Sequence, residues 1–469
     1  MKANLTWEAM RESILKRITP DEDESRAVEY FRAKTERELT ALLREVGLAA
    51  TSEVHGSVAR GTWLAGERDV DVFIVIAPDQ DRSTLLKALD VAKAYVGEDW
   101  VEAYAEHPYI KAVMDGFDVE FVPCFRTDPK GGLLSSTDRT PLHTQFVNRH
   151  LPIERRGDVR LLKQFMRGID VYGAELRVGG FSGYLCELLV IRLGSFEDIL
   201  ENASVWRRSQ TIENLDEGEA DSKRKRLVDP LIATDPVDPN RNVASAVSDT
   251  SMWTFVGAAR EFVKEPAERF FFPKMTPVAA PKIMETIGTR GSGLLFVVID
   301  DDHVDVPDVL WGQLHRAEKA ISNHLSKQDF VVIRSAAWSD ESSRHILVFE
   351  LEDVTIPSVT KKAGPPVEMA DNSERFVKAH LDADTTVSGP WIEGRRWWVE
   401  TRRKCCDARQ LLGSTLGRGG LNIGVPSGLG EKIAKKIKIL MDEEIEDYIQ
   451  GDFTSFIYRF IRGRPVWLD

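Results

Sequence analysis

The chain has 469 residues, of which 42% are hydrophobic and 29% are charged, and its formal net charge is −13 at pH 7. This composition is typical of a soluble globular protein of about three domains, and it excludes a largely disordered chain and, since no apolar run approaches roughly 18 residues, a membrane-spanning one. The acidic balance argues against a uniformly basic surface, but basic segments occur at 223–226 and between Arg395 and Lys436.

The first 150 residues are expected to form an α/β domain. Hydrophobic periodicity predicts the following elements: a helix over 22–46, a strand over 51–55 that leads into Gly56-Ser57, a strand over 70–76, a helix over 83–96, a short apolar segment over 109–114, and a strand over 118–122 closed by Pro123. Strands and helices that alternate in this way indicate a sheet covered by helices.

The rest of the chain divides into three further segments. Residues 151–270 are predicted to be helical, with Arg160, Lys163 and Arg167 beside an apolar stripe formed by Val159, Leu162, Phe165 or Met166, and Ile169. Residues 271–360 have a strand-helix-strand-strand pattern, and we expect the C-terminal helix within 447–469 to join them. The basic, tryptophan-rich segment 361–446 is expected to form a separate tail.

Two carboxylates one position apart lie in the apolar stretch DVDVF. In a strand, Asp69 and Asp71 share one face, and Val70 and Val72 share the other. Asp118 and Glu120, in the strand that follows some fifty residues later, have the same spacing. Three such acids on adjacent strands can hold divalent cations, as nucleotidyl transfer requires.

The turn at Gly56-Ser57 supplies a place for phosphate next to these acids. A glycine lets the backbone approach phosphate oxygens, and the Ser57 hydroxyl can donate a hydrogen bond to them. Arg60, one helical turn later, can add charge-assisted bonds. A Gly-Ser turn, a DxD strand and a later acidic strand together indicate a metal-dependent nucleotidyltransferase.

These motifs resemble those of the DNA polymerase β nucleotidyltransferase superfamily. Over nearly its full length the chain also resembles the archaeal, class I CCA-adding enzymes, through the segments DRTPLHTQFVNRHL, DVRLLKQFMRGIDVYGAELRVGGFSGYLCELL, DPVDPNRNVAS and GPWIEGRRWWVE. The resemblance implies a multidomain α+β fold, with a mixed-sheet, palm-like catalytic head (1–150), a helical neck (151–270), an α/β body (271–360 with 447–469) and a tRNA-binding tail (361–446).

The same resemblance implies the activity and its partners. The enzyme would add or repair the 3′-terminal CCA of tRNA without a nucleic-acid template, from CTP and ATP, by a mechanism that uses two Mg²⁺ ions. The tail would bind the acceptor stem and TΨC arm of the tRNA, and a homodimer is compatible with this reading. We expect no membrane partner and, since the N-terminal segment is charged throughout and unlike a signal peptide, a cytoplasmic protein.

Site residues follow from the resemblance position by position. Asp69, Asp71 and Glu120 correspond to the catalytic metal ligands, although the family usually has Asp where this chain has Glu120, and Asp118 is a rival for that role. The triphosphate and sugar of the nucleotide would be held by Ser57, Arg60, Thr140, His143, Lys163 and Tyr172. The RNA would be held by Arg395, Arg396, Arg402, Arg403 and Lys404. The tryptophans of the tail are expected to alternate into a core.

Arg241 corresponds to the residue that reads the base of the incoming nucleotide. A salt bridge of Arg241 with Asp235 or Asp238 is the structural alternative.

Other functions stay open at this point. The chain could be another RNA nucleotidyltransferase such as a poly(A) polymerase, an oligoadenylate synthase, a small-molecule adenylyltransferase, or a catalytically inactive RNA-binding protein. The basic tail argues against a small substrate, and the intact Ser57, Asp69 and Asp71 argue against an inactive site. Four cysteines without a CxxC pair, and nine histidines without HExxH spacing, argue against a structural zinc site.

Overall fold

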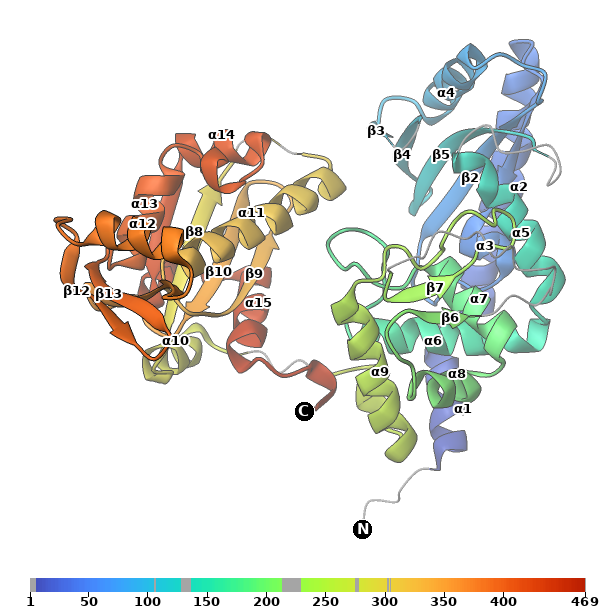
Figure 1. The fold of residues 1–469 in the computed structure, drawn as a ribbon. Coiled ribbons are helices and arrows are strands. Elements are labelled where there is room, and N and C mark those ends of the chain that lie inside the picture. Colours follow the sequence, from blue (N-terminus) through green and yellow to red (C-terminus); the bar gives the residue numbers. More distant parts are fainter. Residues whose placement is uncertain are drawn as a thin grey trace. The chain divides into compact units, whose positions relative to one another are not determined.

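The structure of the protein is a computed structural model that describes residues 6–104, 107–127, 136–212, 229–274, 278–301, 303 and 305–468. The chain forms two compact units, the first comprising Met1–Met275 with Pro465–Asp469 and the second Thr276–Arg464 (Figure 1). The basic run at 223–226 lies outside the described residues. Within the described residues, no helix has both the length and the apolar character that a membrane crossing requires.

The first unit contains a mixed five-stranded sheet in the order β1-β2-β5-β4-β3. Its strands are β1 (Ala50–Val54), β2 (Asp69–Ile76), β3 (Trp100–Tyr104), β4 (Pro108–Met114) and β5 (Phe117–Phe125). β2 and β5 run parallel, and the other neighbouring pairs are antiparallel. α2 (Glu22–Glu45) and α4 (Ser83–Val96) cover one face (Figure 1). The mixed-sheet head expected from the sequence is confirmed.

Local sequence signals explain where α2 begins and which face it buries. The Asp21 carboxylate accepts the Glu24 backbone N–H at 2.8 Å, and the Glu24 carboxylate accepts the Asp21 N–H at 3.1 Å, which forms a capping box. Phe31 and Leu39 of α2 pack in one core with Val72 of β2. The apolar face of the sheet is therefore covered, so the polar side chains of β2 and β5 lie on the opposite face.

Strand β5 continues through Pro123, where the sequence predicted its end. The pairing of β5 with β4 stops at Phe121, whereas its pairing with β2 continues to Phe125. From Val122 onward β5 therefore has a hydrogen-bonding neighbour on one side alone. A residue without an N–H is tolerated at such an edge, which explains why the proline does not end the strand.

A helical layer with one large core completes the first unit. It consists of α5 (Arg139–His150), α6 (Arg156–Gly168), α7 (Gly183–Leu193), α8 (Phe196–Ala203) and α9 (Asp249–Lys264), with the short parallel pair β6 (Gln210–Ile212) and β7 (Leu231–Ala233). The apolar stripe predicted on α6 is buried in this core, including Val159 and Leu162. The helical neck expected from the sequence is therefore present.

The neck core also includes residues from outside 151–270. Ile14 and Ile18 of α1 (Trp7–Ile18), expected in the head, are buried in the neck core. Trp467 is buried there too, although residues 447–469 were expected to join the body. Because apolar side chains from three distant parts of the chain share this core, head and neck form one compact unit.

The second unit is built on a four-stranded antiparallel sheet in the order β14-β8-β10-β9 (Figure 1). Its elements are α10 (Ala280–Thr289), β8 (Gly293–Asp300), α11 (Pro307–Lys327), β9 (Val332–Ser339), β10 (Arg344–Leu351), α13 (Ala408–Leu416), α14 (Ser427–Lys435), β14 (Ile437–Met441) and α15 (Gly451–Arg462). Leu295 and Val297 of β8 pack with α11, α13 and α14, whereas Phe296 and Val298 pack with α10 and α15. The predicted strand-helix-strand-strand order is confirmed, with helices on both faces of the sheet.

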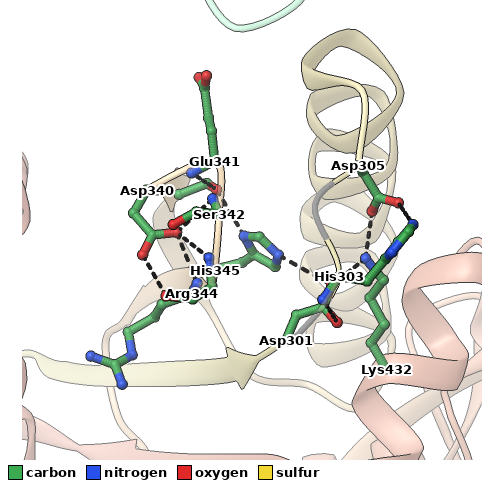
Figure 2. A network of polar contacts seen from close by, with 11 residues as sticks. Asp301, His303, Asp305, Asp340, Glu341, Ser342, Arg344, His345 and Lys432 are labelled. Carbon is green, nitrogen blue, oxygen red and sulfur yellow. Dashed lines mark hydrogen bonds and ion pairs between the residues drawn. The ribbon is translucent and has the colours of Figure 1, made fainter. Parts of the chain in front are cut away.

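Part of the segment expected to form the tail belongs to this sheet. β14 pairs with β8, and α13 and α14 are buried in the body core. Lys432 of α14 forms ion pairs with Asp301 and Asp305, which follow β8 (Figure 2). The expected tail range of 361–446 is therefore too long at its C-terminal end, because residues from 408 onward bury their apolar side chains in the body.

The hairpin between β9 and β10 lies in the same polar network (Figure 2). Asp340 Oδ1 accepts the backbone N–H groups of Ser342, Ser343 and Arg344 at 2.8 to 2.9 Å. Partial burial opposes ionisation, but these N–H groups outweigh it and lower the pKa of Asp340 to about 2. The carboxylate therefore organises the turn in its ionised form.

The remaining tail is a three-stranded sheet with one helix. Its elements are β11 (Val359–Pro366), α12 (Ala370–His380), β12 (Thr386–Glu393) and β13 (Arg396–Arg402), in the strand order β11-β13-β12. Trp391, Trp397 and Trp398 are half-buried, so none of the three is fully enclosed in a core. Lys361 lies over the rings of Trp391 and Trp398, at 5.5 and 4.4 Å from their centroids, which leaves these rings as part of the sheet surface.

The C-terminal helix predicted within 447–469 is α15, and a separate short element precedes it. A 3₁₀ segment, Asp442–Tyr448, is followed by α15, and Gly451 at the junction has a φ of 54°. A continuous α-helix cannot pass through a left-handed residue, which explains the break.

Candidate active site

Four carboxylates lie side by side on the face of the head sheet opposite α2 and α4. The parallel register pairs Asp69 with Asp118 and Asp71 with Glu120. Neighbouring strands are about 4.8 Å apart, so side chains opposite each other in register can converge on one ion. Val70, between the two acids of β2, is buried on the other face. The structure thus brings together the acids that the sequence selected.

Gly56 is placed directly against Asp71. It has a φ of 68°, and a Cβ atom added there would lie 1.9 Å from Asp71 Oδ2. The His55 N–H donates to the Asp71 backbone oxygen at 2.9 Å. Only glycine permits this approach, so the turn that carries Ser57 and begins α3 (Gly56–Arg60) is held next to the acid strand.

The two acids of β2 repel their neighbours in the absence of a cation. Burial, followed by the charges of Glu67, Asp118 and Glu120, raises the pKa of Asp69. Burial and the charge of Glu120 likewise raise the pKa of Asp71, although Arg60 opposes the shift. Carboxylate oxygens that repel one another are the donor set that suits a hard divalent cation.

Glu120 is engaged by a lysine of the neighbouring strand. Lys111 Nζ of β4 lies 2.6 Å from Glu120 Oε1. Within the described residues, no three His, Cys, Asp or Glu side chains are arranged closely enough to hold a metal ion. A cavity of about 550 Å³ lies over this face, lined by residues that include Asp69, Asp71, Asp99, Lys111, Asp118 and Glu120. The donors therefore fit a divalent ion chemically, but the side chains do not form a closed ligand set.

Three cations of α6 hold the loop that joins the Gly-Ser turn to the acid strand. Arg160 donates to the backbone oxygens of Trp63 and Gly61 at 2.9 and 2.7 Å, and Lys163 Nζ donates to Thr62 O at 3.0 Å. Arg167 forms an ion pair with Glu67 at the end of the loop. The basic face predicted on α6 therefore docks on the head.

Lys163, which the resemblance assigns to the triphosphate, is buried. Lys163 is 1% exposed, and burial lowers the pKa of its ammonium group. It lies near Tyr172, because a Cβ atom added to Gly183 would be 3.1 Å from the Tyr172 hydroxyl oxygen and 3.4 Å from Lys163 Nζ. Lys163 and Tyr172 are thus brought together beneath the loop rather than at its surface.

Arg60 is also buried, and its guanidinium is paired within the protein. Arg60 Nε lies 2.8 Å from Glu187 Oε2, and Glu187 also accepts a hydrogen bond from the Thr62 hydroxyl. Glu187 is fully buried in α7. Sequence reasoning missed this residue, although a lone carboxylate in the apolar stretch YLCELLVIRL was a signal, since buried charges need partners. Ser57, by contrast, is half-buried.

His143 and Arg241 meet at one carboxylate. His143 Nε2 and Arg241 Nη1 lie 2.9 and 2.8 Å from Asp235 Oδ2. The structural alternative raised for Arg241, a salt bridge with Asp235, is therefore present, whereas Asp238 pairs with Arg139 at 2.9 Å.

The surroundings of His143 complete this side of the site. Its ring stacks on Tyr184 with 3.9 Å between centroids. Thr140 is half-buried one helical turn before it on α5. Tyr184 is not among the site residues predicted from the sequence.

The cationic residues selected in the tail differ in their exposure and partners. Arg395 pairs with Glu368 at 3.0 Å, and Arg396 donates to Gly364 O at 3.1 Å. Arg403 pairs with Asp329 at 3.0 Å and also donates to backbone oxygens. Arg402 and Lys404 are exposed. Of the five, Arg396 and Arg403 therefore contribute directly to the local structure.

Comparison with known proteins identifies the family. Residues 37–142 match the model of the nucleotidyltransferase domain, 157–272 that of the second domain of tRNA nucleotidyltransferase, and 290–442 that of the C-terminal domain of the CCA-adding enzyme. The last match spans both the body and the tail.

Relatives that match this chain over most of their length are CCA-adding enzymes. The CCA-adding enzymes of Methanosarcina acetivorans and Methanothermobacter thermautotrophicus are both 36% identical to the chain, covering 97% and 96% of it and 98% and 97% of their own lengths. That of Pyrobaculum islandicum is 37% identical over 89% of this chain and 95% of its own. A solved structure of the Cid1 poly(U) polymerase has 14% identity and a TM-score of 0.43, and it covers 55% of this chain and 94% of its own. At such identity over nearly its full length, the chain belongs to the family of CCA-adding enzymes, the tRNA nucleotidyltransferases.

Proposed function

We propose that Asp69, Asp71 and Glu120 form the catalytic centre with which this tRNA nucleotidyltransferase adds C, C and A to tRNA 3′ ends from CTP and ATP. The proposal rests above all on one observation, the register that sets Asp71 beside Glu120 next to the glycine at position 56. Enzymes of this superfamily use a divalent metal ion, and we propose two magnesium ions held by the three carboxylates. Bound magnesium would favour ionisation of the primer hydroxyl and neutralise phosphate charge.

The residues around the acids have distinct roles in this proposal. The Ser57 hydroxyl donates a hydrogen bond to a phosphate oxygen, because the turn at Gly56 brings the backbone of this segment next to Asp71. Lys111 holds Oε1 of Glu120, which leaves Oε2 to accept a proton. The primer 3′-hydroxyl gives up this proton as its own oxygen attacks the α-phosphate. The bond to pyrophosphate breaks as the new phosphodiester bond forms.

Three cations support the triphosphate site indirectly, by holding the backbone around it. Lys163 and Arg167 fix the loop between the turn and β2, and Arg60 fixes the end of α3 through Glu187. These contacts support a preorganised binding surface for phosphate. We propose that Thr140, His143 and Tyr172 contact the sugar and phosphates, and that Arg241 reads the base.

The tail is proposed to bind the acceptor stem and TΨC arm of the tRNA. Duplex RNA is recognised largely through its backbone, which exposed cations can contact at the phosphates. Arg402 and Lys404 are exposed on the tail sheet and directly after it, and they are the residues of the predicted set best able to do so.

The activity is tested with three tRNA transcripts that end at the discriminator base, after the first added C, or after the second. The expected result is incorporation of C, C and then one A, whereas repeated addition of A would indicate a poly(A) polymerase. Asp71→Asn should abolish incorporation and leave tRNA affinity unchanged. Glu120→Gln and Asp118→Asn form a matched pair, since both acids belong to β5. Loss of activity in the Asp118 variant alone would reject Glu120 as the third carboxylate.

A further inference from the structure

Asp235 is a fully buried carboxylate to which the proposed function gives no part. Its side chain is 0% exposed, and one oxygen, Oδ2, accepts both Arg241 Nη1 and His143 Nε2. The other oxygen accepts the backbone N–H of Val237 at 3.1 Å. A single anionic group thus joins Arg241 and His143, which come from different segments of the first unit and are both proposed to contact the nucleotide.

The loop that carries Asp235 has a fixed backbone. The Asp235 N–H donates to Arg241 O at 3.0 Å, and the Arg241 N–H donates to Asp238 O at 2.9 Å. Next to these, Thr234 and Asn242 form a β-bridge. The loop is therefore closed by its own backbone, and the Asp235 carboxylate is not required to close it.

A second ion pair ties the same loop to the same helix. Asp238 accepts Arg139 Nη1 of α5 at 2.9 Å, three residues along the loop from Asp235 and one helical turn from His143. Neither Arg241 nor His143 takes part in this pair. The loop thus contacts α5 through two carboxylates, Asp235 and Asp238, and Asp235 is the one that binds the side chains assigned to the nucleotide.

The Asp235 carboxylate also decides which nitrogen of His143 carries the proton. Burial lowers the pKa of His143, so its ring is neutral near pH 7. Burial opposes ionisation of Asp235, but the hydrogen bonds from His143, Val237 and Arg241 together outweigh it and lower the pKa of Asp235, which keeps that group an acceptor. Nε2 therefore carries the hydrogen and Nδ1 is left as an acceptor, while stacking on Tyr184 holds the ring plane.

We infer that Asp235 is a positioning residue for nucleotide selection: its Oδ2 atom fixes Arg241 and His143 together, so that the remaining guanidinium N–H groups of Arg241 meet the base in one orientation. The inference rests on the proposed function, in which these two residues contact the incoming nucleotide. A guanidinium has several donors and no acceptor. Aimed at a ring nitrogen, it favours cytosine N3 and adenine N1, which accept, over uracil N3 and guanine N1, which donate.

The test compares Asp235→Asn with Asp238→Asn on a tRNA that ends at the discriminator base. For each variant, kcat and KM are measured with CTP and with UTP, together with tRNA affinity and the melting temperature. We expect Asp235→Asn to lower the CTP-over-UTP preference by about 10-fold to 100-fold, as loss of a charged hydrogen bond does. Asp238→Asn should stay within about 3-fold of the wild type, and tRNA affinity should be unchanged in both.

A double variant separates positioning from a purely structural effect. If Asp235 acts through Arg241, Asp235→Asn combined with Arg241→Ala should lose no more CTP preference than Arg241→Ala alone. Additive losses, or equal losses in Asp235→Asn and Asp238→Asn, would overturn the inference. If instead Arg241→Ala keeps the full CTP preference, the proposed role of Arg241 fails. If Arg241→Ala loses the preference while Asp235→Asn keeps it, the proposed role stands and the inference falls.

Discussion

A methyl group at position 56 should disable the enzyme with little effect on its fold. In Gly56→Ala the new Cβ would lie 1.9 Å from Asp71 Oδ2, whereas an ordinary contact needs at least about 3.4 Å. The Asp71 carboxylate must therefore move by more than an ångström. A displacement of that size in an active site can reduce the rate by about 100-fold. We expect kcat to fall by at least this factor.

The backbone strain of the same substitution can be measured separately. A non-glycine residue in the left-handed region loses about 1–2 kcal/mol of stability, which lowers the melting temperature of a domain of this size by a few degrees. Gly47 provides the matched control, since its φ of 76° is close to the 68° of Gly56 and nothing lies within 4 Å of an added Cβ. Gly47→Ala should show the same loss of stability with normal activity.

The assay is single-turnover incorporation of labelled CTP, with tRNA affinity measured in parallel. Activity of Gly56→Ala within about 3-fold of Gly47→Ala would refute the reasoning, because the contact between the turn and Asp71 would then be irrelevant to catalysis. Loss of tRNA binding in Gly56→Ala would refute it too, since the displaced carboxylate does not lie on the proposed tRNA-binding surface.

Glu187→Ala should lower the free energy of unfolding by about 3–5 kcal/mol, because it leaves the buried Arg60 guanidinium unpaired, and chemical denaturation measures this loss. Arg402→Gln combined with Lys404→Gln should weaken tRNA binding and flatten its dependence on salt, with CTP affinity kept; an unchanged salt slope would exclude the tail as the docking surface. Because the pKa of Asp340 is lowered to about 2 in the folded protein, its stabilisation is present above about pH 4 and is lost as the pH falls toward 2. Melting curves of Asp340→Asn should lack that part of the wild-type pH dependence.

Periodicity and spacing are sufficient for the elements that a local sequence pattern defines. The strand with Asp69 and Asp71, the capped helix before it, and the facing pair Asp118 and Glu120 all follow from alternation and local turns. The end of β5 was misjudged, because a proline stops a strand only where its missing N–H is needed, and that depends on which strand lies alongside.

Contacts between distant segments could not be predicted in the same way. Glu187 and Arg60 are 127 residues apart, and nothing local to either indicates the other. The burial of Lys163 is also a tertiary effect, since its position beside an apolar stripe fits a surface lysine equally well. For the same reason, β14 was assigned to the tail from its place in the chain, although it pairs with a strand well over a hundred residues earlier.

The hydrogen bonds from α6 to the loop of residues 61–67 limit where this chain can be divided into fragments. The carbonyl oxygens of Gly61, Thr62 and Trp63 are satisfied by side chains from beyond residue 155. A fragment cut after the sheet would leave those oxygens without their donors and release the segment that leads to Asp69. The head sheet therefore depends on α6, and a transfer of the sheet to another protein would have to include this helix.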